Sequence, residues 1–113
     1  MAAAGMFAGP SLAVADTPWV YESSKRQCAA RWLSSQNQFR IDDRDLNDDD
    51  YCYVDFSWVA SHEPEMRRSH PQDVPGARDY SVSVGGRDVI HWQVCKERQD
   101  DPDICSDWRT DRT

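Results

Sequence analysis

Features that would place this chain in a membrane or on nucleic acid are absent from its sequence. The stretch of small and apolar residues from Ala2 to Ala15 is shorter than the ~20 residues that a membrane-spanning helix requires. The 20 acidic residues outnumber the 13 lysines and arginines, which gives a formal net charge of −7. A basic surface for phosphate backbones is therefore missing, and anionic lipid headgroups would repel the chain. We expect neither nucleic acid nor a membrane as partner.

Recognisable catalytic and cofactor motifs are absent as well. There is no Gly-x-Ser-x-Gly sequence. His62-Glu63 begins like a zinc-protease helix, but the second histidine is missing and Pro64 would interrupt that helix. The 16 aspartates make some carboxylate pair inevitable, so they give no evidence of glycoside hydrolysis. We therefore expect no enzymatic activity and no cofactor.

The first 15 residues have the features of a secretory signal. Ala13-Val14-Ala15 follows a run of small and apolar residues, as at a signal cleavage site. The run opens without the usual Lys or Arg, so we interpret residues 1–15 as a truncated signal, or one whose start codon is called late, and expect the mature chain to begin at Asp16. The alternative is an apolar N-terminal helix, which would have to tolerate Gly5, Gly9 and Pro10. About a hundred residues remain, which suits a single β-domain spanning 16–113. We expect this domain to be secreted and extracellular.

Alternation of apolar and polar residues predicts an all-β fold. Pro64, Pro71, Pro75 and Pro102 all lie between the alternating segments. This arrangement is typical of an antiparallel β-sandwich or small barrel. Gly85-Gly86 predicts a tight hairpin turn between two of the strands. The expected strands are Gln27–Leu33, which also suits one or two helical turns, Gln38–Asp42, Tyr51–Ala60, Tyr80–Val84, Val89–Cys95 and Ile104–Arg109.

Four cysteines in a small exported domain are expected to form disulfides. Cys95 and Cys105 both lie opposite the apolar residues of their strands, on either side of a nine-residue loop, as a hairpin-closing bridge requires. Cys28 and Cys52 then pair by default, although two other connectivities are open. Loop entropy predicts contributions of about 2.7 and about 3.5 kcal/mol for the two bridges. A zinc site is disfavoured because no two cysteines stand in a close Cys-x-x-Cys pair.

The run from Asp42 to Asp50 has the highest density of carboxylates in the sequence. Asp43, Asp45, Asn47 and Asp49 fall on alternate positions, like the first oxygen ligands of a calcium loop. An EF-hand starting at Asp43 would need glycine at position 48 and glutamate at position 54, and neither is present. We interpret the run as a solvated turn between strands, with a loose calcium site at these three aspartates as the alternative.

The segment from Asp16 to Glu22 is our first candidate for a docking element. It carries Trp19 and Tyr21 ahead of the first cysteine, and both residue types are common interface anchors. The alternative is an edge strand of the sandwich. By contrast, Trp58 and Trp92 share the parity of core residues in their strands, so we expect them to pack inside.

Part of the chain resembles a known group of proteins. The sequences Phe39-x-Ile41-x-Asp43, Val89 to Cys95 and Cys105-Ser106-x-Trp108 resemble small secreted proteins of Streptomyces and related actinobacteria, over about the last 75 residues. The resemblance implies export, a Cys95–Cys105 bridge and an all-β fold, but this group mostly lacks an assigned activity. Such proteins are also similar to the adaptor subunits of umbrella toxin particles, which join a scaffold chain to a lectin-like subunit.

These observations favour a secreted, non-enzymatic binding or adaptor domain that engages another extracellular protein. The main alternative is a disulfide-stapled inhibitor of a secreted hydrolase, presenting Ser61–Arg78 or Lys96–Ile104 as a rigid loop. A small secreted hydrolase is the third possibility.

Overall fold

The computed structural model describes residues 16–45, 50–58, 66–72, 74–85 and 89–113. The proposed signal, residues 1–15, lies outside these ranges. No helix in the described part of the chain is long and apolar enough to cross a membrane. The strands are β2 (Val20–Tyr21), β3 (Cys28–Leu33), β4 (Gln38–Asp43), β5 (Cys52–Ser57), β6 (Met66–Ser69), β7 (Arg78–Ser81), β8 (Val89–Lys96), β9 (Ile104–Cys105) and β10 (Arg109–Arg112).

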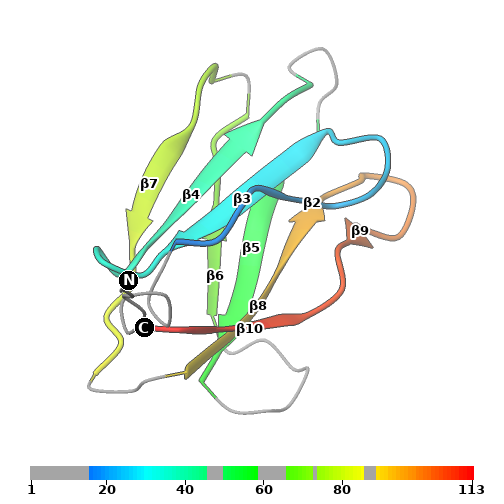
Figure 1. Ribbon diagram of the computed structural model, residues 1–113. Coiled ribbons are helices and arrows are strands. Elements are labelled where there is room, and N and C mark those ends of the chain that lie inside the picture. Colours follow the sequence, from blue (N-terminus) through cyan, green and yellow to red (C-terminus); the bar gives the residue numbers. More distant parts are fainter. Residues whose placement is uncertain (1–15, 46–49, 59–65, 73, 86–88) are drawn as a thin grey trace, which may run out of the picture.

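Two antiparallel sheets pack face to face, which confirms the predicted all-β sandwich (Figure 1). One sheet has the strand order β2-β3-β4-β7, and the other has the order β10-β8-β5-β6, with β9 also paired to β8. β3 pairs with β4 along its whole length, from Cys28 opposite Asp43 to Leu33 opposite Gln38. The segment that also suited helical turns is therefore a strand.

The core between the sheets is centred on Phe39. Its ring centroid lies 4.7 Å from that of Trp32 and 5.3 Å from those of Phe56 and Trp92, so aromatic rings from both sheets meet there. Trp92 is fully buried, as its parity predicted, whereas Trp58 is half-buried and packs against the core margin. The buried core residues are Cys28, Ala30, Trp32, Phe39, Ile41, Cys52, Val54, Phe56, Val82, Ile90, Trp92 and Val94.

Both predicted disulfides are present. Cys28–Cys52 links β3 to β5 and so ties the two sheets together, with a Cα–Cα distance of 5.5 Å. Cys95–Cys105 links directly opposed residues of β8 and β9. No cysteine is free. Disulfides in a chain of this size are consistent with an extracellular location.

The predicted hairpin at Gly85-Gly86 is wrong. β7 pairs with β4, whereas β8 pairs with β5, β9 and β10 in the other sheet. The chain therefore crosses between the sheets here. Gly85 does adopt a positive φ of 61°, and Gly86 lies outside the described residues. The alternating pattern identified the buried face of each segment but carried no information about its partner strand.

The expected strand Ile104–Arg109 is instead two short strands separated by a bulge. Cys105 lies opposite Cys95 and Arg109 opposite Trp92, so residues 106–108 face only residues 93–94 of β8. Ser106 secures the bulge, because its Oγ accepts a hydrogen bond from the Val94 amide at 3.1 Å. Such an extra residue re-aims the strand that follows it.

Tyr53, on the face of β5 that points away from the core, is fixed by a hydrogen bond and a cation–π contact. The residue is 2 % exposed, and its hydroxyl donates a hydrogen bond to the Asp103 carboxylate. The Arg67 guanidinium lies 3.9 Å above the ring and forms a two-point ion pair with Asp55. Burial, reinforced by the hydrogen bond to the Asp103 carboxylate, raises the pKa of Tyr53 well above its usual value.

We expect Tyr53 to make the fold sensitive to alkaline pH. In the unfolded chain a tyrosine loses its proton near pH ~10, while folded Tyr53 retains it, so stability falls as the pH rises through that value. Urea unfolding midpoints between pH ~8.5 and ~10.5 should decline in the native chain and decline less in Tyr53→Phe. A residual slope is expected because burial also raises the pKa of Tyr80. Parallel declines in the two proteins would contradict this role.

Candidate binding surface

The N-terminal segment is an edge strand, and it is attached to the sheet at its start. β2 pairs with β3, with Val20 opposite Ala30 and Tyr21 opposite Ala29. Upstream of β2, the Thr17 amide donates to the Trp32 carbonyl at 3.0 Å, and the Thr17 Oγ1 accepts from the Trp32 amide at 2.8 Å. The segment therefore has a defined position on the domain.

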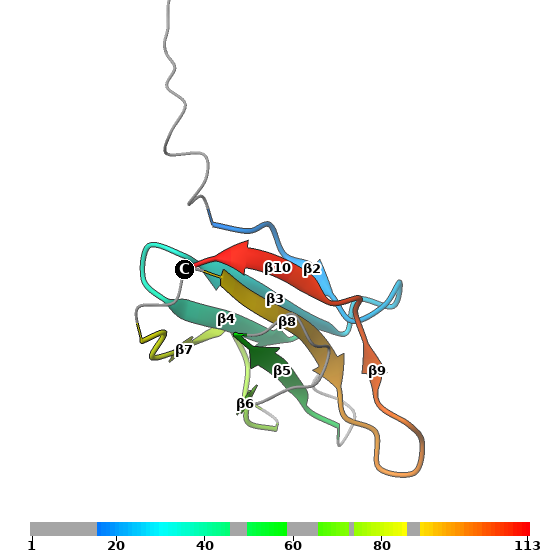
Figure 2. The ribbon, with the colours of Figure 1, turned by 90° about the horizontal axis from the view of Figure 1, so that it is seen from below.

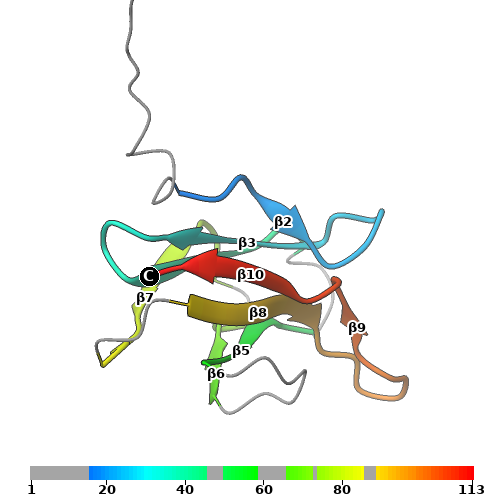
Figure 3. The same ribbon diagram turned by 60° about the horizontal axis from the view of Figure 1, so that its bottom comes forward.

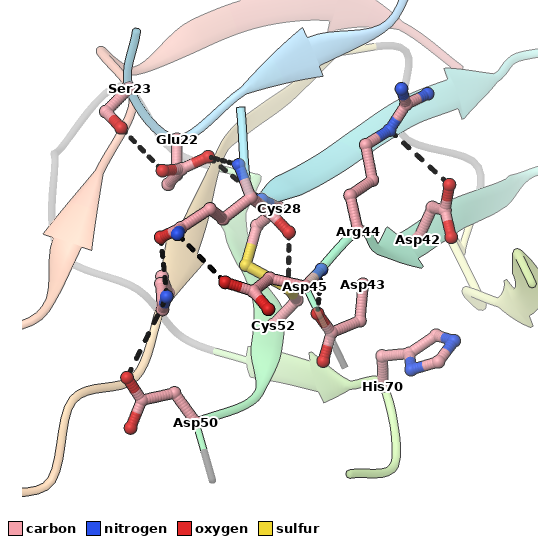
Figure 4. The surroundings of a disulfide bond; sticks show 12 residues. Glu22, Ser23, Cys28, Asp42, Asp43, Arg44, Asp45, Asp50, Cys52 and His70 are labelled. Atoms are coloured by element: carbon pink, nitrogen blue, oxygen red, sulfur yellow. Dashed lines mark hydrogen bonds and ion pairs between the residues drawn. A yellow bond between two sulfur atoms is a disulfide. The ribbon is translucent and has the colours of Figure 1, made fainter. Parts of the chain in front are cut away.

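Glu22 fixes the other end of this segment. The residue is 2 % exposed, and its carboxylate accepts hydrogen bonds from the amides of Gln27 and Cys28 at 2.8 and 2.9 Å (Figure 4). The Ser23 hydroxyl donates a third bond, at 2.5 Å. Because these bonds satisfy a buried charge, they hold the turn between β2 and β3 in one conformation.

Trp19 and Tyr21 lie on the outer face of the four-stranded sheet. Val20, between them, packs against the core, so its neighbours point away from the core. Both rings are half-buried. The predicted candidates thus share one face and leave part of their surface to solvent.

Three arginines alternate with these two rings. The guanidinium carbon of Arg26 lies 5.0 Å from the Tyr21 ring centroid, and that of Arg44 lies 5.2 Å from the same ring. Arg44 also lies 5.6 Å from the Trp19 centroid, as does Arg31. Contacts at these distances are attractive cation–π interactions. We call the series Arg26, Tyr21, Arg44, Trp19 and Arg31 the arginine–aromatic ladder.

The ladder carries little compensating negative charge. Arg44 Nε lies 3.4 Å from Asp42 Oδ2 (Figure 4). Within the described residues, Arg26 and Arg31 form no ion pair, and the buried Nε of Arg31 has no hydrogen-bond acceptor. On a chain of net charge −7 this is a local cationic and aromatic surface.

A groove runs beside the ladder. It has a volume of about 450 Å³ and lies between the free edge of β2 and the segment that carries β9 and the start of β10. Figures 2 and 3 show β2 and β10 as neighbouring edges of the two sheets. Tyr21 belongs to both the ladder and the groove, and Trp108 lines the opposite wall.

The proposed calcium ligands are engaged with protein groups. The Asp43 Oδ1 accepts a hydrogen bond from the Asp45 amide at 3.1 Å, and the Asp45 carboxylate accepts one from Gln27 Nε2 at 3.0 Å (Figure 4). Asp49 lies outside the described residues. Among the residues that are described, no group of three or more His, Cys, Asp or Glu side chains is placed to hold a metal ion.

Gln27 extends this network to the other sheet. Its Oε1 accepts a hydrogen bond from the buried Lys96 Nζ at 2.5 Å, and Lys96 lies 3.9 Å from Asp50. Asp45 and Asp50 are thus joined through Gln27 and Lys96, beside the Cys28–Cys52 bridge. Asp45 and Asp50, on either side of the undescribed part of the acidic run, therefore both take part in polar interactions that hold the fold together.

Sequence reasoning found the two rings but missed Arg26, Arg31 and Arg44. The available signal was the parity of β3, which puts Arg31 on the face opposite Trp32. Without the register between β2 and β3, nothing showed which cations would meet the rings. Comparison of the chain with protein-family models, with curated proteins and with solved structures finds no match in any of the three.

Proposed function

We propose that this chain is a secreted, non-enzymatic binding domain that engages another extracellular protein through the arginine–aromatic ladder. The observation that carries the proposal is the composition of the ladder. Trp, Tyr and Arg are the residue types most enriched among those that dominate binding energy at protein interfaces. Here all five ladder residues are of these types, and they occupy one partly exposed face.

The rigidity of the surface supports the same proposal. Trp19 and Tyr21 lie on a segment fixed by Thr17 and Glu22, and the neighbouring Cys28–Cys52 disulfide joins the sheets. Side chains that are ordered before association lose less conformational entropy on binding. Export is part of the proposal, and it is supported by the disulfides and by the Ala13-Val14-Ala15 sequence.

An inhibitor of a secreted hydrolase is the second candidate, and one loop favours it. The segment between β8 and β9 is closed by Cys95–Cys105 and exposed at residues 99–103. Arg98 orders the loop from within, through an ion pair with Asp101 at 2.7 Å and a bond from its amide to Asp103 at 3.3 Å. A constrained exposed loop is the form in which many inhibitors meet proteases. The other candidate loop, Ser61–Arg78, is not a loop throughout, because Met66–Ser69 forms strand β6 against β5; its residues 61–65 and 73 lie outside the described residues.

Hydrogen exchange on the complex separates the two candidates. The disulfide-bonded chain is used to retain a binding protein from the culture medium of its own host, and amide exchange is compared in the free and bound states. We expect new protection at residues 19–26, because the Tyr21 amide has no backbone partner within the described residues. Protection confined to residues 97–103 would contradict the proposal that the ladder is the binding surface, and it would support the inhibitor function.

A further inference from the structure

The guanidinium groups of the ladder retain unused hydrogen-bond donors. The rings meet the guanidinium groups through cation–π contacts, which use no N–H, whereas N–H groups point outward in the guanidinium plane. Within the described residues, no hydrogen bond or ion pair engages the guanidinium group of Arg26 or of Arg31. A planar carboxylate matches this donor geometry, and a pairing of this kind is about twice as strong as a neutral hydrogen bond.

Arg31 is the least exposed cation of the ladder, whereas Arg26 and Arg44 are exposed. Its Nε is buried with no hydrogen-bond partner, while its guanidinium stacks on Trp19. A cation that is already partly desolvated has less water to lose when an anion approaches. The attraction between the two charges is also stronger where water is excluded.

The edge of β2 indicates the shape of what binds there. Glu22 N donates to the Cys28 carbonyl at 3.2 Å, and Val20 lies opposite Ala30, so these residues direct their backbone groups toward β3. In an antiparallel pair of strands, the residue between two such positions directs its backbone N–H and C=O away from the partner strand. The N–H and C=O of Tyr21 therefore face the groove, where an extended chain can pair with them.

The spacing of the cations suits such an extended chain. The guanidinium carbons of Arg26 and Arg44 lie 5.0 and 5.2 Å from the Tyr21 ring centroid. The distance between these two carbons is therefore no greater than the sum of the two values. In an extended strand, side chains two residues apart share a face and are separated by ~7 Å. Carboxylates at alternate positions can therefore reach neighbouring guanidinium groups.

We infer that the binding partner presents an extended segment with acidic side chains at alternate positions, which lies along β2 with its carboxylates against the arginines of the ladder. This inference rests on the proposed function and adds the chemistry of the partner.

The test uses a short synthetic peptide in which glutamate and threonine alternate, titrated into the disulfide-bonded chain and followed by NMR. We expect shifts at the Tyr21 amide and at the Nε–H groups of the three arginines, with affinity that falls as salt rises from ~50 to ~500 mM. Arg26→Gln, Arg31→Gln and Arg44→Gln should each weaken binding up to about fivefold, and the triple variant by about tenfold or more. Arg78→Gln, at the exposed far edge of the same sheet, changes the charge equally and should leave affinity unchanged.

Four results would overturn the inference. The first is equal binding of a peptide with glutamine in place of glutamate, and the second is equal binding when the glutamates form one block. The third is equally strong binding of inorganic phosphate at the same resonances, since the site would then accept any anion. The fourth is self-association that the triple arginine variant abolishes, because the occupant would then be a second copy of this chain.

Retention of the natural partner by two variants distinguishes the failure of this inference from the failure of the proposed binding function. If Trp19→Ala/Tyr21→Ala releases the partner while the triple arginine variant retains it, the binding function stands and the acidic segment is wrong. If both variants retain the partner, the ladder is not the interface.

Discussion

Replacing Cys28 and Cys52 with alanine is expected to lower the free energy of unfolding by about 3.5 kcal/mol. The bridge spans 24 residues, and in the chain-entropy model longer closed loops restrict the unfolded ensemble more strongly. Small domains are stabilised by only about 5–15 kcal/mol in total, so this loss is a large share. Urea unfolding of the oxidised native chain and the double variant measures the difference.

The second disulfide provides the matched control. Cys95–Cys105 spans 10 residues, and its removal should cost about 2.7 kcal/mol. The ranking is reinforced by burial, because Cys28 and Cys52 are 1 % exposed in the core whereas Cys105 is exposed. A larger loss from the Cys95–Cys105 pair would contradict the view that the longer, buried Cys28–Cys52 bridge contributes more to stability.

The sequence was a good guide wherever side-chain parity alone decides the outcome. Alternation in the segments around Phe39, Val54 and Trp92 placed these residues in the core, because a half-buried strand has a period of two. The same parity separated Cys95 and Cys105 from the apolar face, and the observed pairing followed. These features depend on local pattern and not on which strands become neighbours.

Features that depend on strand pairing were less accessible. The crossover after Val84 was predicted as a hairpin, and the bulge at residues 106–108 was not predicted. Arg44 reached the ladder from beyond the end of β4, a contact set by the register of β2, β3 and β4. Such contacts join residues far apart in the chain, and no local signal specifies them.

Deleting the segment Asp16–Glu22 would not isolate its role in binding. The same residues pair with β3, and the Glu22 carboxylate holds two amides of the following turn. Loss of these contacts would destabilise the domain whatever the segment binds. Point substitutions at the two outward rings keep the backbone pairing of Val20 and are therefore the better probe.

The loss of both ladder rings is expected to abolish most of the binding. Anchors of this type can each contribute 2 kcal/mol or more to an interface, so Trp19→Ala/Tyr21→Ala should weaken the partner's affinity by about 100-fold or more. The four cation–π contacts are partly exposed and worth about 0.5–1 kcal/mol each, so the variant should still fold. Tyr51→Ala removes a half-buried aromatic side chain outside the ladder and is the control.

The binding role of the ladder is tested most directly by dissociation constants for the retained partner. They are measured for the native chain, for Trp19→Ala/Tyr21→Ala and for Tyr51→Ala, under conditions where urea unfolding shows all three proteins to be folded. We expect the double variant to lose about 100-fold in affinity and Tyr51→Ala to bind like the native chain. A folded double variant that binds with native affinity would contradict the proposal that the ladder is the binding surface.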